Sequence, residues 1–149
     1  MSEQFEKYNF TEKNEKLKSR EVFTDDFDVI GPDDEIDCLE ALPVSCAIMT
    51  IAKPEQNIAG MSHFSLGLNK EGVGDLVNQF QNKLRKFGLN ISDCKIRFFN
   101  TGDILSAEIK SSLPLHNIDL PPSEWMEAEG IRINKNTGEV TFFSLTEGQ

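Results

Sequence analysis

One cysteine and one histidine, Cys46 and His63, stand among apolar and small residues in the stretch "SCAIMTIAKPEQNIAGMSHF". A thiol within reach of an imidazole can pass its proton to the ring, and the resulting thiolate is a strong nucleophile. The imidazolium can then protonate a leaving amine. The pair is therefore the minimum set of groups for acyl transfer from an amide. The alternative is structural, with a buried cysteine acting as a small hydrophobe and a histidine in the core or at its rim.

Two expected strands would bring these residues together. Residues 45–52, "SCAIMTIA", form a short continuous apolar run bounded by prolines, which predicts a buried strand. Residues 57–67 alternate in the manner of a second strand, and the intervening "KPEQN" has the length and composition of a hairpin turn. A hairpin places the start of one strand beside the end of the next. We therefore expect Cys46 and His63, which are 17 residues apart, to lie in contact.

The other hydrophobic patterns predict one helix and further strands. Residues 74–88 place apolar side chains on one helical face, namely Leu76, Val77, Phe80, Leu84 and Phe87, with Gly88 at the end. Strands are expected to start near Ile36 and to cover residues 94–100 and 103–115, and residues 130–144 are expected to form a closing hairpin. This order is typical of an α+β domain in which a helix packs on a mixed or antiparallel sheet.

Negative charge is concentrated near the N-terminus. The chain of 149 residues has a net charge of -10, and residues 1–40 contain 13 acidic and 5 basic side chains. We expect residues 1–35 to form an acidic N-terminal arm that is partly helical or disordered, and residues 36–149 to form a single domain. So acidic a chain is expected to bind neither nucleic acid nor anionic membrane surfaces.

Several classes of function lack the motifs they require. The chain has no apolar segment long enough to insert into a membrane, and "MSEQFEKYNF" lacks the apolar region of a secretory signal. The three cysteines, Cys38, Cys46 and Cys94, have no paired spacing, which favours a reducing compartment. No metal-binding or nucleotide-binding motif is present. We expect a cytoplasmic protein without metal or cofactor, with a secreted effector as the alternative.

The segment that ends at His63 resembles the CheD family of bacterial chemoreceptor glutamine deamidases. In that family a Ser-Cys nucleophile on one strand is followed by a turn containing proline and then by a "G-(G/A)-M-(A/S)-H" segment. Here Ser45-Cys46, Pro54 and "AGMSH" stand in the same order, and the spacing from cysteine to histidine is that of the family. A weaker likeness in the helix and in the closing hairpin extends the resemblance over roughly residues 36–144.

The resemblance implies a CheD-like domain that hydrolyses the side-chain amide of a protein glutamine through a cysteine thioester. Cys46 would then be the nucleophile and His63 the base. The family's third catalytic group is a threonine, and Glu40 holds its position here. A carboxylate at that position would orient the imidazole. The alternatives are that Glu40 is a surface residue, and that Asn100 or Thr101 orients the ring.

Three functions use these features. The favoured one is a protein-glutamine deamidase, an enzyme whose partner is a glutamine-bearing chemoreceptor or, for an effector, another protein. The second is a CheD-like binding module whose activity has lapsed and which regulates a protein partner. Pro43 and Val44, where the family has glycines, favour that module, and Trp125, the only tryptophan, would be a partner contact if it does not cap the core. The third is a thiol protease or transamidase, which would use the same cysteine and histidine.

Overall fold

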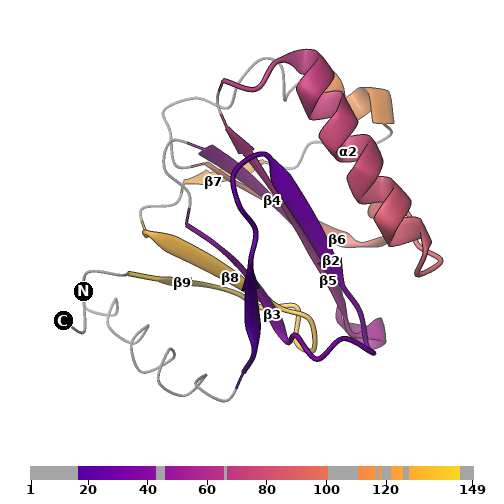
Figure 1. Cartoon of the computed structure of the whole chain (residues 1–149), viewed down its shortest axis with the longest axis vertical. Coiled ribbons are helices and arrows are strands. Elements are labelled where there is room, and N and C mark those ends of the chain that lie inside the picture. The colour runs from indigo at the N-terminus through magenta and orange to yellow at the C-terminus, as the bar shows by residue number, and fades with distance from the viewer. Residues whose placement is uncertain are drawn as a thin grey trace.

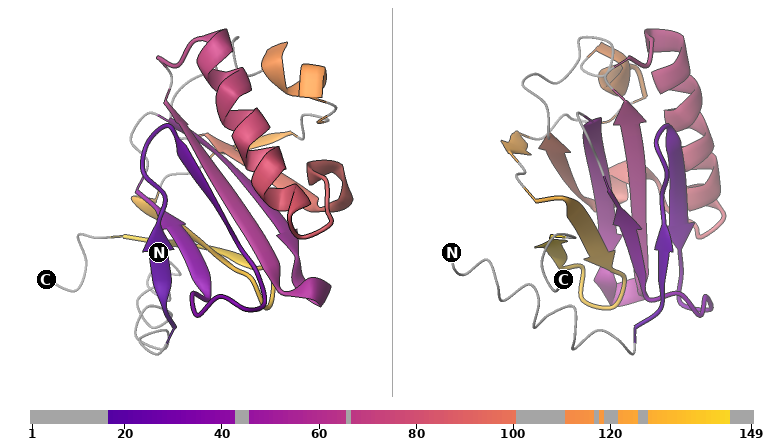
Figure 2. Two further views of the ribbon diagram at one scale, coloured as in Figure 1. Left: turned by 45° about the vertical axis from the view of Figure 1, so that its right-hand side comes forward. Right: turned by 60° about the vertical axis from the view of Figure 1, so that its left-hand side comes forward.

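A three-layer α+β fold is seen in the computed structural model, which describes residues 17–42, 46–65, 67–100, 111–116, 118, 122–125 and 128–144. Within these residues the strands form a four-stranded sheet, in the order β1-β3-β8-β9, and a five-stranded sheet, in the order β2-β5-β4-β6-β7. Pairs β1/β3 and β6/β7 are parallel and the other pairs are antiparallel, so both sheets are mixed. Helix α2 (Lys70–Arg85) covers one face of the five-stranded sheet, and the four-stranded sheet covers the other (Figure 1 and Figure 2).

Each sheet combines segments that are distant in the sequence. The four-stranded sheet contains β1 (Ser19–Glu21), β3 (Cys38–Ala41), β8 (Gly130–Asn134) and β9 (Val140–Phe143). The five-stranded sheet contains β2 (Asp26–Ile30), β4 (Cys46–Lys53), β5 (Ile58–Ser65), β6 (Lys95–Asn100) and β7 (Ser123–Trp125). Short 3-10 helices follow β4, α2 and β6 in the chain: η3 (Pro54–Gln56), η4 (Ile91–Asp93) and η5 (Leu113–His116).

Strands β4 and β5 are buried at every position except their last residues. One face contacts the helix, and its core includes Ala47, Met49, Phe64, Val77 and Phe80. The opposite face contacts the four-stranded sheet, and its core includes Ile48, Met61, Leu39, Phe99 and Ile131. Burial on both faces explains why residues 46–52 are apolar without alternation.

Helix α2 confirms the helix expected over residues 74–88, but it begins at Lys70. The Asn69 side chain caps its first turn, accepting a hydrogen bond of 2.7 Å from the Gly72 N–H. Gly88 follows the helix with a φ of 80°, a backbone conformation that glycine adopts without a steric penalty. Four of the five expected apolar residues are buried, namely Leu76, Val77, Phe80 and Leu84, while Phe87 is half-buried.

The N-terminal region differs from the expected acidic arm. Strands β1 and β2 both lie within residues 17–35, and Val22, Val29 and Ile30 are buried. Val29 joins the core beneath α2, whereas Val22 and Ile30 join the core between the sheets. Residues 17–35 are therefore part of the folded domain, and residues 1–16 lie outside the described residues.

Two other expectations need correction. The single expected sheet is in fact two sheets, with β3 and the closing hairpin in one and the β4–β5 hairpin in the other. The strand expected over residues 103–115 is wrong at its end, where residues 111–116 are helical. Residues 101–110 lie outside the described residues. The closing hairpin of β8 and β9 is confirmed.

Close packing at Gly60 predicts a large effect of a small substitution. A methyl group added at Gly60 would lie 2.8 Å from Ile51 Cγ1 and 2.8 Å from Phe80 Cε1. We expect Gly60→Ala to lower the free energy of unfolding by about 1–3 kcal/mol, as overpacking of a core does. Urea unfolding measures this. Gly67→Ala is the matched control, because no atom lies within 4 Å of its added methyl. Equal effects of the two substitutions would contradict the packing described.

Candidate active site

Cys46 and His63 lie on one face of the β4–β5 hairpin. In the antiparallel ladder Cys46 is opposite Ser65, and Ile48 is opposite His63. Directly opposed residues share a face, as do residues two positions apart on one strand, so Cys46 and His63 are diagonal neighbours with Cα atoms about 7–8 Å apart. Ile48 belongs to the core between the sheets, so this face is the one that the four-stranded sheet covers. Both side chains are buried, with exposed fractions of 4% and 2%.

A backbone carbonyl fixes the orientation of the His63 ring. His63 Nδ1 lies 3.1 Å from the Val22 carbonyl oxygen. A carbonyl can only accept a hydrogen bond, so Nδ1 carries the hydrogen, and in the neutral ring Nε2 then holds the lone pair. Nε2 is buried and has no hydrogen-bond partner among the described residues. It is therefore the nitrogen that is available to accept a proton.

The electrostatic surroundings keep His63 neutral at neutral pH. Burial lowers the pKa of His63. The hydrogen bond to the Val22 carbonyl and the charges of Asp25 and Glu21 act in the opposite direction, but burial is the largest effect. A neutral imidazole with an available Nε2 is the form that a general base requires.

The β1–β2 turn, residues 22–25, forms hydrogen bonds with the last residues of β5. The Asp25 N–H donates to the His63 carbonyl at 2.6 Å. The Asp25 carboxylate accepts from the Ser65 N–H at 2.8 Å and from Ser65 Oγ at 3.0 Å. Asp25 has a φ of 61°, in the left-handed region that aspartate tolerates better than most residues. The turn therefore holds His63 and also Ser65, the residue opposite Cys46.

Glu40 does not reach His63, so the expectation that it orients the ring is wrong. Its neighbours Leu39 and Ala41 face the core between the sheets, which places Glu40 on the outer face of the four-stranded sheet. There its carboxylate accepts a hydrogen bond of 2.6 Å from Arg132 Nε on β8. The ion pair with Arg132 accounts for a partly buried glutamate at this position.

Asn100, another candidate for the third group, is not brought to His63 either. Asn100 is opposite Ala47, which faces the core beneath α2, so Asn100 lies on the other face of the sheet. Thr101 and residues 43–45 lie outside the described residues. The sequence does not indicate that the Val22 carbonyl orients the ring, because every residue has a backbone carbonyl and no side-chain type distinguishes this one.

The two other thiols are poor nucleophiles at neutral pH. Burial raises the pKa of Cys38 to about 11 and that of Cys94 to about 11. Both thiols therefore stay protonated, and it is the thiolate that reacts. No disulfide involves either of them. A reagent that reacts only with thiolates should therefore leave Cys38 and Cys94 largely unlabelled at neutral pH.

No protein-family model matches the chain, and no curated protein matches it. Within the described residues no group of three or more His, Cys, Asp or Glu side chains is placed to hold a metal ion. The helices in that part of the chain are too short or too polar to cross a membrane. The chemistry of the site must therefore be inferred from its own side chains.

The lowered pKa of His63 predicts a pH-dependent stability. The unfolded histidine has a pKa of about 6.5, so as the pH falls below about 7 the unfolded chain takes up a proton before the folded chain does. The free energy of unfolding should therefore fall with pH in this window, and His63 should contribute no pH dependence above it. In the His116→Gln variant, which retains one imidazole, NMR titration should give a pKa below that of free histidine. The variant His63→Gln should lose this part of the pH dependence. A pKa of His63 above that of free histidine, measured in the His116→Gln variant, would contradict the burial described.

The contacts of Asp25 predict a graded response to substitution. Asp25→Ala removes both hydrogen bonds to Ser65, each worth about 0.5–1.5 kcal/mol, so we expect a loss of about 1–2 kcal/mol in the free energy of unfolding. Asp25→Asn keeps one acceptor oxygen and tolerates the left-handed conformation, so it should lose less than half as much. Urea unfolding measures both losses. Asp33→Ala, at an exposed carboxylate, should change stability by less than about 0.5 kcal/mol. A loss there as large as that of Asp25→Ala would rule out a special role for Asp25.

Proposed function

We propose that the protein is a CheD-like protein-glutamine deamidase, in which Cys46 attacks the side-chain amide of a glutamine in another protein. The observation that carries the proposal is the state of His63: a buried, neutral ring with Nδ1 bound to the Val22 carbonyl and Nε2 without a partner among the described residues. Cys46 shares its face of the hairpin. This arrangement supports acyl transfer from an amide, and the resemblance of residues 45–63 to the family supports glutamine as the substrate.

The proposed reaction proceeds in two halves. The Cys46 thiol gives its proton to His63 Nε2, and the thiolate attacks the glutamine carboxamide carbon to form a tetrahedral oxyanion. The imidazolium returns the proton to the nitrogen, the carbon–nitrogen bond breaks, and ammonia leaves behind a thioester. Water then attacks the thioester while Nε2 accepts its proton, and the carbon–sulfur bond breaks. The products are glutamate and the restored thiol.

The groups around His63 suit the imidazolium that forms along this path. The Val22 carbonyl accepts from Nδ1 in both protonation states and so holds the ring in one orientation. The charges of Asp25 and Glu21 favour the protonated ring. Burial disfavours the protonated ring, so the ring readily gives its proton to the leaving nitrogen. In this proposal a carbonyl and two carboxylates do together what Glu40 was expected to do alone.

A binding module on the same fold is the second candidate. Cys46 and His63 are buried, with 4% and 2% of their surfaces exposed, as residues with a structural role would be. Trp125, by contrast, is 57% exposed and offers an aromatic contact to a protein partner. A module of this kind would bind its partner equally well with or without the Cys46 thiol.

The substitution Cys46→Ser separates the two candidates. A serine hydroxyl is far less acidic than a thiol, so we expect ammonia release from a glutamine-bearing chemoreceptor fragment to fall by about 10³-fold or more. The side chains are nearly isosteric, so circular dichroism and the unfolding midpoint should change little. Cys94→Ser is the matched control and should retain full activity, because the Cys94 thiol has a pKa of about 11. Unchanged ammonia release from Cys46→Ser would exclude the proposed nucleophile. A wild-type protein without activity that still binds its partner would establish the module.

A further inference from the structure

A large aromatic side chain projects from the turn that fixes the catalytic histidine. Phe23 is 63% exposed, the most exposed of the large hydrophobic side chains in the described residues. Its neighbour Val22 supplies the carbonyl that binds His63, and Asp25 is fastened to Ser65. A protein that contacts Phe23 would therefore contact the element that positions the proposed base.

Acidic residues flank Phe23 in the chain. Glu21, Asp25 and Asp26 are exposed, and they precede or follow Phe23 by no more than three residues. The charges of Glu21 and Asp25 act on the His63 ring, and the Asp25 carboxylate contacts Ser65, the residue opposite Cys46. The one cation in β1, Arg20, is engaged by Asp28 at 2.5 Å and does not neutralise them. We call Phe23, Glu21, Asp25 and Asp26 the acidic turn surface.

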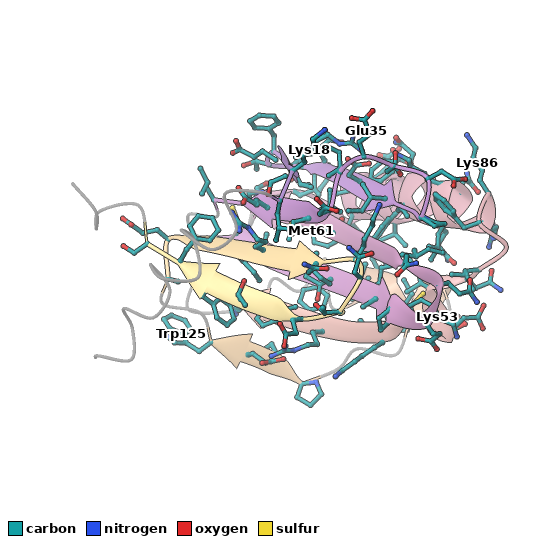
Figure 3. The ribbon with its side chains drawn as sticks, turned by 90° about the horizontal axis from the view of Figure 1, so that it is seen from below. Lys18, Glu35, Lys53, Met61, Lys86 and Trp125 are labelled. Carbon is teal, nitrogen blue, oxygen red and sulfur yellow. The ribbon has the colours of Figure 1, made fainter. Side chains whose placement is uncertain are left out.

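The other exposed aromatic residue in the described part of the chain, Trp125, lies at the same end of the five-stranded sheet as Cys46. Trp125 is in register with Asn100, which is in register with Ala47, the residue next to Cys46. Figure 3 shows Trp125 at one end of the molecule and Lys53, the last residue of β4, at the other. Phe23 precedes β2 and Trp125 ends β7, which are the two edge strands, so they lie on either side of Cys46.

We propose that the acidic turn surface docks a basic segment of the substrate protein, in which lysine or arginine residues and an apolar residue flank the target glutamine. This rests on the proposed function. Phe23 would bury its ring against the apolar residue, and the carboxylates would pair with the cations. The occupant is specified by charge complementarity, since within the described residues the cations next to these carboxylates in the chain, Lys18 and Arg20, are paired with Glu35 and Asp28. An acidic glutamine segment would be repelled by the same carboxylates.

The binding test uses the Cys46→Ser variant, so that no turnover occurs, and two fluorescent peptides of equal length. Both peptides carry a central glutamine and one leucine, flanked by lysines in one and by glutamates in the other. Fluorescence anisotropy should give a Kd at least ten-fold lower for the lysine peptide, and the difference should shrink as salt is raised. Equal Kd values for the two peptides would overturn the proposal.

Matched variants separate the acidic turn surface from the overall charge of -10. Glu21→Lys and Glu55→Lys change the net charge equally, but Glu55 lies on η3, beside the end of β4 far from Cys46. We expect Glu21→Lys to raise the Kd of the lysine peptide about three- to ten-fold and Glu55→Lys to raise it less than two-fold. Equal effects would show that binding follows net charge and would overturn the proposal.

A second pair of variants tests the aromatic contact. Phe23→Ser should raise the Kd of the lysine peptide about ten-fold, as the loss of an aromatic contact does, and Trp125→Ser should change it less than two-fold. If only Trp125→Ser weakens binding, the docking surface lies at β7 and the proposal is wrong. Circular dichroism of both variants excludes unfolding as the cause.

The same peptides distinguish failure of docking from failure of the proposed reaction. If the wild-type protein releases ammonia equally from both peptides while binding shows no charge preference, the reaction stands and docking fails. If the lysine peptide binds as expected but releases no ammonia, docking stands and the deamidase proposal fails. Faster ammonia release from the lysine peptide, through a lower KM at similar kcat, supports both.

Discussion

Strands β4 and β5 carry apolar side chains on both faces, so both faces must be buried, and the arrangement of the other elements follows from this constraint. Helix α2 covers one face and the four-stranded sheet covers the other, so the molecule has three layers. Cys46 and His63 lie on the face that the four-stranded sheet covers. The turn of residues 22–25 lies at the margin of that sheet. That margin supplies the Val22 carbonyl to the histidine ring. The need to bury an apolar hairpin and the orientation of the proposed base therefore have a common structural origin.

Local patterns were enough to predict the hairpin and the helix, but not the division into sheets. A period of two residues assigns faces within a strand, yet it does not say which strands pair, and β3 pairs with β8 from the far end of the chain. The sequence does not indicate β1 and β2, because their acidic residues, Glu21, Asp26 and Asp28, outnumber their buried ones, Val29 and Ile30. In this region burial is set by tertiary contacts, which composition does not reveal.

The candidate site shows the same limit. The face shared by Cys46 and His63 follows from a hairpin that was visible in the sequence, whereas their chemical roles are still proposals. The position of Glu40 was misread because its partner, Arg132, is 92 residues away. Asp25 forms hydrogen bonds with Ser65 and with the His63 carbonyl. The only sign of this in the sequence is the turn-forming residues "TDD". Side chains with distinctive chemistry can be identified from the sequence, but the backbone groups that bind them can be identified only from the three-dimensional structure.

The late position of β8 in the chain has a consequence for biosynthesis. During translation β2, β4, β5, α2 and β6 leave the ribosome before the closing hairpin, and without it they can form four strands of the five-stranded sheet and its helix. The opposite face of that sheet cannot be covered until the closing hairpin emerges to join β3. A nascent chain would thus expose Ile48, Met61 and Phe99 to solvent until the closing hairpin has been made. Chaperones that recognise apolar strands would find their binding site on the surface that later encloses Cys46 and His63.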